Sequence, residues 1–345
     1  MGQNKQADLK AGIGLVLSGL IAIYAVVTFI IGFYFYVFPP DNAVTAFFLS
    51  GYIVVLTPTF VIALLLVLTI RRWWLLLLVL PNLFLIAIYL APYYAPNPEI
   101  VVPDGIPIRV MTYNVESKSH LPVRNIFADL IEATNPDIMA FQEFREDGYN
   151  YWQEEGRLSN YPYIAWVMTD NGGLSGQAVY SQFSIIEAEE IRYDDLSPFH
   201  PHQRLLLDVN GRQIVVYNIH PYPPIEWEGL SIAANESDLS AHSIAMERLL
   251  VRMEAETLPM LVIGDMNMSD RFPEYRALAD LMTDSYLEAG NGFGFTYPAD
   301  SRLPELIRLD FIFHSSHFTA VDAYVVPDND TADHLPVVVD LILED

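Results

Sequence analysis

The stretch MLVIGDMNMSD, residues 260–270, joins an apolar run to two polar side chains. The run from Met260 to Ile263 is typical of a short buried strand, and Gly264 follows it. Asp265 and Asn267 come next, two residues apart. Residues two apart on an extended segment point the same way, so we expect both side chains to face one ligand.

Polar residues also end the other strands predicted around this stretch. Each has a structural explanation when taken singly; Asp265, for example, could begin an Asx-turn. If the strand ends converge, they form one acidic site with two imidazoles, which suits an oxygen-preferring ion such as Mg²⁺, with Mn²⁺ or Ca²⁺ as alternatives. The residues concerned are Asn114, Glu143, Asn218, His220, Asp265, Asn267, Asp310, Asp333 and His334.

Residues 107–345 alternate predicted strands with predicted helices. Apolar residues recur with helical spacing at 121–133, 237–256 and 272–281. Asn210-Gly211 lies between two strand candidates and is a strong hairpin signal. Hairpins together with crossover helices predict an α/β fold of mixed sheets covered by helices. The strand candidates are 107–113, 137–142, 177–180, 185–191, 204–209, 213–219, 258–263, 306–313, 319–326 and 335–343.

The first 95 residues have the composition of a membrane domain. The runs 11–38, 43–70 and 73–95 contain no charged residue, and each exceeds the roughly 20 residues that cross a bilayer. The alternative, a cleaved signal peptide followed by core helices, requires a much shorter apolar run of roughly 7–15 residues. We therefore predict an all-α segment of three transmembrane helices that contacts the lipid bilayer through residues 11–95.

The placement of basic residues predicts the topology in the cell membrane. Lys5 and Lys10 precede the first span, and Arg71-Arg72 separate the second from the third. Both positions are expected on the cytoplasmic side, which puts the N-terminus inside and everything after residue 95 outside. We predict three parts: a membrane domain at 1–95, a Pro-rich linker at 96–106 and an α/β domain at 107–345 that carries the polar strand ends.

The order of motifs resembles the endonuclease/exonuclease/phosphatase superfamily, which includes DNase I-like nucleases, neutral sphingomyelinases and inositol polyphosphate phosphatases. The resemblance covers residues 107–343 and implies a two-sheet α/β sandwich with the site at the sheet edge. The three-span leader is similar to that of membrane-bound bacterial members. The matching segments are VMTYNVES (110–117), PDIMAFQEF (136–144), GQAVYSQFSI (176–185), VVYNIHPYPP (215–224), VIGDMNMSD (262–270), RLDFIFHS (308–315) and TADHLPVVVDL (331–341).

The resemblance implies a metal side of the site made of three residues. Glu143 would be the main metal ligand, and Asn114 would lie beside it and hold metal-bound or phosphate oxygens. Asp333 would be a further carboxylate on the metal side. The implied cofactor is Mg²⁺, or Mn²⁺ or Ca²⁺ in its place.

The resemblance also implies a catalytic side. Asp265 would orient and deprotonate the attacking water, and Asn267 would hydrogen-bond the phosphoryl oxygen or the water. His334, held by Asp310, would donate to the phosphoryl oxygen. His220 would contact the phosphate or help the leaving group. Metal and imidazoles neutralise charge on the oxygens, while a carboxylate supplies the base.

Two departures from the family pattern concern charges near the site. Gln182 stands where family members often carry Arg, so one cation is missing. Residues 171–182 contain no carboxylate, whereas some nucleases of the family place a Glu there to pair with the residue that corresponds to His220. The partner of His220 is therefore unassigned from the sequence.

Four further polar residues are candidates for binding substrate or metal. We assign Asn218 and Arg204 to substrate binding; Arg204 could steer a phosphate or form a surface ion pair. His200 and His202, in SPFHPHQR, could bind metal, but a solvated turn is the preferred interpretation.

Charge separates the candidate functions. Beyond residue 95 lie 41 of the 43 acidic residues and 14 of the 18 basic residues, which gives this part a formal charge of −27. Its one lysine is Lys118. The first hypothesis is a membrane-anchored, metal-dependent phosphoesterase that hydrolyses a phosphodiester, phosphomonoester or pyrophosphate of a lipid-linked or small substrate. The alternative is an extracytoplasmic DNase I-like nuclease, which so acidic a surface disfavours. The third is a catalytically silent, membrane-coupled binding module. The sequence indicates no protein partner.

Overall fold

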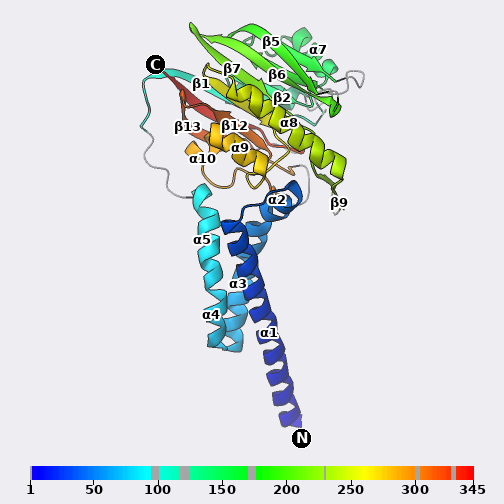
Figure 1. Ribbon diagram of the computed structural model, residues 1–345, viewed down its shortest axis with the longest axis vertical. Coiled ribbons are helices and arrows are strands. Elements are labelled where there is room, and N and C mark those ends of the chain that lie inside the picture. Colours follow the sequence, from blue (N-terminus) through cyan, green and yellow to red (C-terminus); the bar gives the residue numbers. More distant parts are fainter. Residues whose placement is uncertain are drawn as a thin grey trace.

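The chain forms a bundle of apolar helices with an α/β domain at one end of it (Figure 1). The computed structural model describes residues 2–94, 101–116, 118, 124–169, 176–193, 195–228, 231–299, 304–327 and 332–345. The linker prediction at 96–106 lies partly outside the described residues. The N-terminus is at the end of the bundle remote from the α/β domain (Figure 1).

Three helical segments are long and apolar enough to cross a membrane: Leu9–Val37, Ala43–Ile70 and Trp73–Tyr94. They match the three uncharged runs of the sequence. Asn82, fully buried, joins two of them, because it accepts a hydrogen bond from Thr28 Oγ1 at 2.9 Å and donates one to the Ala25 carbonyl at 3.0 Å. The helices are α1 (Gly2–Val37), α2 (Ala43–Ser50), α3 (Tyr52–Ile70), the 3-10 helix η1 (Trp73–Leu75), α4 (Leu76–Val79) and α5 (Pro81–Tyr94).

Two six-stranded mixed sheets form the α/β domain. In the first, β1 runs parallel to β2 and antiparallel to β14; in the second, β10 runs parallel to β7 and antiparallel to β12. The first sheet has the order β13 (Phe318–Val325), β14 (Val337–Glu344), β1 (Gly105–Asn114), β2 (Ile138–Gln142), β4 (Gly176–Ser181), β3 (Tyr163–Met168). The second has the order β11 (Thr283–Asp284), β12 (Asp310–His314), β10 (Met260–Asp265), β7 (Arg212–Asn218), β6 (Ser197–Val209), β5 (Ser184–Tyr193).

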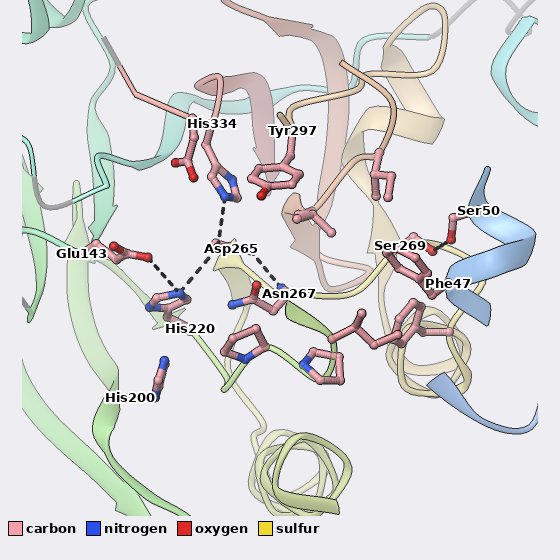
Figure 2. A pocket seen from close by; sticks show the side chains of 17 residues that line it. Phe47, Ser50, Glu143, His200, His220, Asp265, Asn267, Ser269, Tyr297 and His334 are labelled. Atoms are coloured by element: carbon pink, nitrogen blue, oxygen red, sulfur yellow. Dashed lines mark hydrogen bonds and ion pairs between the residues drawn. The ribbon is translucent and has the colours of Figure 1, made fainter. Parts of the chain in front are cut away.

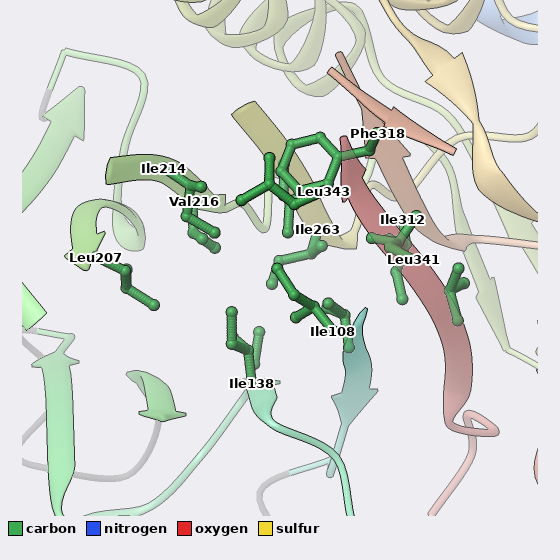
Figure 3. Close-up of a cluster of buried hydrophobic side chains, with 14 of the residues drawn as sticks. Ile108, Ile138, Leu207, Ile214, Val216, Ile263, Ile312, Phe318, Leu341 and Leu343 are labelled. Atoms are coloured by element: carbon green, nitrogen blue, oxygen red, sulfur yellow. The ribbon is translucent and has the colours of Figure 1, made fainter. Parts of the chain in front are cut away.

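Apolar faces of the two sheets pack against each other to form the central core (Figure 3). Ile108 and Leu341 of the first sheet and Ile263 and Ile312 of the second belong to it. Helices cover the outer faces, which completes the sandwich that the sequence predicted. They are α6 (Arg124–Thr134) and α7 (Glu146–Glu155) on the first sheet, and α8 (Glu236–Glu254) and α9 (Pro273–Leu281) on the second, with the short α10 (Ser285–Ala289) near the β12 edge.

Several element boundaries differ from the sequence prediction. Asn210 and Gly211 do form the tight β6–β7 turn with positive φ, as a two-residue hairpin requires. β12 begins at Asp310, so the predicted strand 306–313 is wrong for residues 306–309. β6 begins at Ser197, earlier than the predicted 204. The sequence analysis missed β3, β11 and the small hairpin of β8 (Glu226–Glu228) and β9 (Ser231–Ala233).

The α/β domain contacts the apolar N-terminal helices through the segment that follows Asn267. Ser269 Oγ lies 2.5 Å from Ser50 Oγ, and Arg271 Nη2 donates to the Tyr93 hydroxyl at 2.9 Å. The Tyr93 hydroxyl in turn donates to Asp270. One segment therefore joins the polar end of β10 to α2 and α5.

Candidate active site

The predicted polar strand ends meet at one edge of the sandwich. Asn114 ends β1, Glu143 follows β2, and Asp265 ends β10. Asp310 starts β12 directly opposite Asp265 in the antiparallel register, and His334 precedes β14. Because β12 and β14 run antiparallel to β10 and β1, their beginnings lie where the other strands end.

Asp265 is the centre of the group and is only 1% exposed. Its Oδ2 accepts a hydrogen bond from Asn114 Nδ2 at 2.9 Å, and it lies 3.5 Å from His220 Nε2 and 3.7 Å from His334 Nε2 (Figure 2). Burial alone would raise the pKa of this carboxyl, but the two imidazoles and Asn114 outweigh it and hold the pKa well below its usual range. Asp265 is therefore a carboxylate aimed between two histidines.

The backbone before Asp265 is built for a close approach. Gly264 has φ 142°, and a Cβ at this position would lie 2.0 Å from the Ile219 carbonyl oxygen. Only glycine lets β10 end this close to the segment after β7 that carries His220.

His334 is oriented by a buried carboxylate. Its Nδ1 lies 2.7 Å from Asp310 Oδ2, while its Nε2 faces Asp265. Burial opposes protonation of the ring, but Asp310 and Asp265 outweigh it and raise the pKa of His334 well above its ordinary value. The Tyr297 ring lies 5.0 Å from the imidazole, centroid to centroid. The arrangement holds a proton on His334 and points Nε2 into the site.

His220 has two carboxylate neighbours, which answers the question left by the sequence. Its Nε2 lies 3.5 Å from Asp265 and 3.9 Å from Glu143 Oε1. Burial opposes protonation of this ring too, but Asp265 and Glu143 outweigh it and raise the pKa of His220. Its backbone N–H donates to His202 Nδ1 at 3.1 Å, which fixes the main chain beneath the ring.

The interpretation of His200 and His202 as a solvated turn is wrong. Both lie on β6, His202 is 1% exposed, and His200 lines the cavity with its ring 5.2 Å from that of His220. Burial, followed by the neighbouring histidines, lowers the pKa of each to about 3. The spacing of two residues was the available signal, because alternate residues of a longer β6 share one face.

Asn267 reaches the site by a turn and not along an extended strand. Its φ is 50°, and its backbone N–H donates to Asp265 Oδ1 at 2.9 Å, so Asp265 does begin an Asx-turn. The expectation of an extended segment is therefore wrong, although Asn267 still lines the cavity. Its Nδ2 donates to the Pro221 carbonyl at 3.0 Å, which ties it to the segment that carries His220.

Glu143 and its neighbours fit a divalent cation. Glu143 has φ 52°, which turns it into the cavity, and its side chain keeps 34% exposure while Asn114 Nδ2 contacts it at 3.2 Å. Asp333 lines the same cavity. Several carboxylates around one cavity repel each other, and a hard cation with oxygen ligands relieves that repulsion.

A second group of donors lies deeper in the site. Ligand atoms of Asp265, Asp310 and His334 lie within 4.8 Å of one another, so these residues form a possible metal site. The second carboxylate oxygen of Asp310, Oδ1, is buried and has no hydrogen-bond partner among the described residues. This group differs from the predicted ligands Glu143, Asn114 and Asp333.

The structure does not bring Asn218 or Arg204 to the cavity lining. Asn218 is fully buried and exchanges hydrogen bonds with Gln142 and Gln203, so it holds the two sheets together below the site. Arg204 forms an ion pair with Glu256 at 2.5 Å, as the alternative expected, but the two side chains are only 17% and 13% exposed, so the pair is partly buried and not on the surface. Gln182 donates to the Pro136 carbonyl at 3.1 Å and is not among the lining residues either.

A cavity of about 310 Å³ contains the site and has two unlike ends. Glu143, Asp265 and His334 line one end (Figure 2). Phe47 and Ser50 of helix α2 line the other (Figure 2). Between them the lining includes Pro223, Pro224, Ile225, Phe272, Ile307 and Leu309. The apolar N-terminal helices therefore supply part of the cavity wall, which the sequence analysis missed.

The two-sheet sandwich, with buried carboxylates and imidazoles at one edge, is typical of phosphoesterase-like proteins. The model of the endonuclease/exonuclease/phosphatase family matches residues 111–334, and the chain belongs to this family. No curated protein matches the chain.

Solved structures share the fold at low sequence identity. An endonuclease/exonuclease/phosphatase from Beutenbergia cavernae is 20% identical with a TM-score of 0.56, covering 69% of this chain and 72% of that one. TDP2 of D. rerio, complexed with a single-strand DNA product, is 14% identical with a TM-score of 0.55 and covers 68% and 98%. The mannosyl-6-phosphatase Bt3783 of Bacteroides thetaiotaomicron is 18% identical with a TM-score of 0.50 and covers 68% and 99%.

Proposed function

We propose that the protein is a membrane-anchored, divalent-metal-dependent phosphoesterase whose substrate is a lipid-linked or small phosphate ester outside the cytoplasm. The observation that carries this proposal is the two-ended cavity, in which Asp265 and His334 face Phe47 of a membrane helix. A phosphate group suits the first end and an apolar group suits the second. The family includes enzymes that cleave phosphate esters, and the fold is shared with the mannosyl-6-phosphatase.

The protein side chains divide the work of hydrolysis. Asp265, kept ionised by its neighbours, orients a water and takes its proton as the water oxygen bonds to phosphorus. His334, protonated on both ring nitrogens, donates a hydrogen bond from Nε2 to a phosphoryl oxygen, while Asp310 accepts from Nδ1–H and stabilises the charged ring. As the bond from phosphorus to the leaving oxygen breaks, that oxygen takes up a proton, which His220 is placed to supply. Asn267 positions the water or a phosphoryl oxygen.

Glu143, Asn114 and Asp333 would hold the divalent ion, and Asp265, Asp310 and His334 are the alternative set. When bound, the ion supplies a Lewis acid that draws charge from the phosphoryl oxygens. Asn114 contacts both Glu143 and Asp265, so it keeps the metal side and the base at a fixed separation.

The bundle supports a catalytic domain outside the cytoplasm. The N-terminus lies remote from the α/β domain, and α3 leads away from that domain toward Arg71 and Arg72 (Figure 1). Both basic clusters are then on the side opposite the catalytic domain, and basic residues favour the cytoplasmic side. The nuclease alternative has less support, because a formal charge of −27 beyond residue 95 repels a polyphosphate backbone.

A hydrolysis panel tests the proposal. The detergent-purified protein is given bis-p-nitrophenyl phosphate, p-nitrophenyl phosphate, a phospholipid, an isoprenoid pyrophosphate and plasmid DNA, each with Mg²⁺, Mn²⁺, Ca²⁺ or EDTA. We expect metal-dependent hydrolysis that Asp265→Asn abolishes and Asp322→Asn, at an exposed position of β13, retains. Cleavage of DNA in preference to every other substrate would replace the proposal by the nuclease, and activity that survives Asp265→Asn would refute the assigned site.

A further inference from the structure

A second cavity lies in the membrane bundle directly beside the catalytic one. It has a volume of about 450 Å³ and lies between α1, α2 and α3. We call it the helix groove. Its lining is Tyr24, Thr28, Phe47, Phe48, Gly51, Tyr52, Val54, Val55, Leu56, Thr59, Leu306 and Ile307.

The helix groove and the catalytic cavity share a boundary. Phe47 and Ile307 line both of them. Phe47 comes from the membrane helices and Ile307 from the segment that leads into β12 and Asp310. An extended molecule can therefore occupy both spaces, with one end beside the membrane helices and the other beside Asp265.

Hydrogen bonds between its walls shape the helix groove. The Tyr52 hydroxyl donates to the Thr28 carbonyl at 2.7 Å, and the hydroxyls of Tyr24 and Thr59 lie 2.7 Å apart. Polar atoms of the wall thus satisfy one another and leave an apolar surface for a ligand. A wall braced in this way is largely formed before a ligand arrives.

The helix groove opens toward the surroundings of the bundle. Phe48 and Val55 belong to its lining and are 65% and 62% exposed. In a bilayer, these side chains face lipid tails. A hydrocarbon chain can pass from the bilayer into the groove without crossing water, which would cost free energy for each methylene exposed.

We propose that the helix groove holds a hydrocarbon chain of the substrate while its phosphate lies beside Asp265 and His334. The substrate class is then a membrane lipid with a phosphate ester at the end of a long apolar chain. This inference rests on the proposed phosphoesterase function and names the source of its substrate. From Gly51 to Thr59, α3 advances about 12 Å, which sets the length of chain that the groove accommodates.

Gly51 gives a direct way to fill the helix groove. A Cβ at Gly51 would meet only the Phe48 carbonyl oxygen, at 4.0 Å, and its φ of −80° suits any residue. Gly51→Leu therefore places a branched side chain at the groove wall. Gly19→Leu is the matched control, because Gly19 lies on α1 outside the groove lining with nothing within 4 Å of its Cβ.

The test compares two esters with identical reacting groups. Methyl p-nitrophenyl phosphate and hexadecyl p-nitrophenyl phosphate release p-nitrophenolate when water attacks phosphorus, and they differ only in the chain. We expect the protein in lipid nanodiscs to favour the hexadecyl ester. Gly51→Leu should lower the hexadecyl-to-methyl ratio of kcat/KM on the order of tenfold, equivalent to about 1.4 kcal/mol of lost chain binding. Gly19→Leu should keep the wild-type ratio.

A second measurement does not depend on turnover. Hexadecylphosphonate with a diazirine at the chain end should label α3 between Tyr52 and Thr59 on illumination, and the label should be lost in Gly51→Leu. Equal ratios in all three proteins, or label spread over every lipid-facing helix, would overturn the groove while leaving the phosphoesterase intact. Hydrolysis of neither ester, together with no activity on any substrate of the hydrolysis panel, would remove the proposed function, and the labelling pattern would still decide whether the groove binds a chain.

Discussion

Replacing His202 by Asn should make the protein more resistant to acid. His202 is buried beneath the site, and desolvation, then the neighbouring His220 and His242, lowers its pKa from 6.5 to about 3. Between these values the unfolded chain binds a proton that the folded protein excludes. The titration of His202 therefore lowers the free energy of unfolding as the pH falls below 6.5. From pH 7.5 to pH 5 the loss from this one residue is about 2 kcal/mol.

Thermal unfolding at the two pH values measures the effect. For a domain of this size, about 2 kcal/mol corresponds to a shift in Tm of roughly 4–8 °C. The Asn side chain keeps an acceptor for the His220 N–H but has no proton to gain. Between pH 7.5 and pH 5, the Tm of His202→Asn should therefore fall by roughly 4–8 °C less than the Tm of the wild type. His317→Asn, at an exposed position, should keep the wild-type fall. If His202→Asn loses as much Tm as the wild type, the buried neutral histidine is not what makes the fold acid-sensitive.

Two further substitutions test the backbone and the orientation of the site. Gly264→Ala should destabilise the protein by on the order of 3 kcal/mol in denaturant unfolding, because its φ is 142° and its new Cβ would meet the Ile219 carbonyl; an unchanged midpoint would contradict the close approach. Asp310→Asn should lower kcat by about a thousandfold or more and change KM little, since an amide does not hold the proton on His334. A proportional rise in KM would instead indicate a role in substrate binding.

The edge of the sandwich was predictable because strand direction determines where strand ends meet. Asn114 ends a stretch of alternating apolar residues and Asp265 ends an apolar run. Parallel pairing puts Asn114 beside β2, which leads to Glu143, and puts Asp265 beside β7, which leads to His220. Asp310 could be placed there as well, since an antiparallel strand that begins beside the end of β10 starts at the same edge. Local pattern and topology agree at these positions.

The predictions for single side chains failed where the contacts of the side chain depend on residues that are remote in sequence or on a local hydrogen bond. Arg204 could reach a phosphate or a carboxylate, and the packing of β6 against β7 and α8 places Glu256 beside it. His202 looks polar and solvated in the sequence, but an unrecognised extension of β6 buries it. Asn267 leaves the strand because the carboxylate of Asp265 captures its N–H, a local competition that the pattern of apolar residues does not register.

The apolar N-terminal helices of this protein line part of the candidate active-site cavity. Ser269 and Arg271 follow Asn267 by only a few residues, and they contact Ser50 of α2 and Tyr93 of α5. Any shift of the bundle relative to the sandwich therefore acts on the segment that carries Asp265 and Asn267. Sequence patterns locate each helix and strand separately. They could not show that the segment after β10 and helix α2 line the same cavity. That shared wall connects the polar edge of the sandwich to the apolar N-terminal helices.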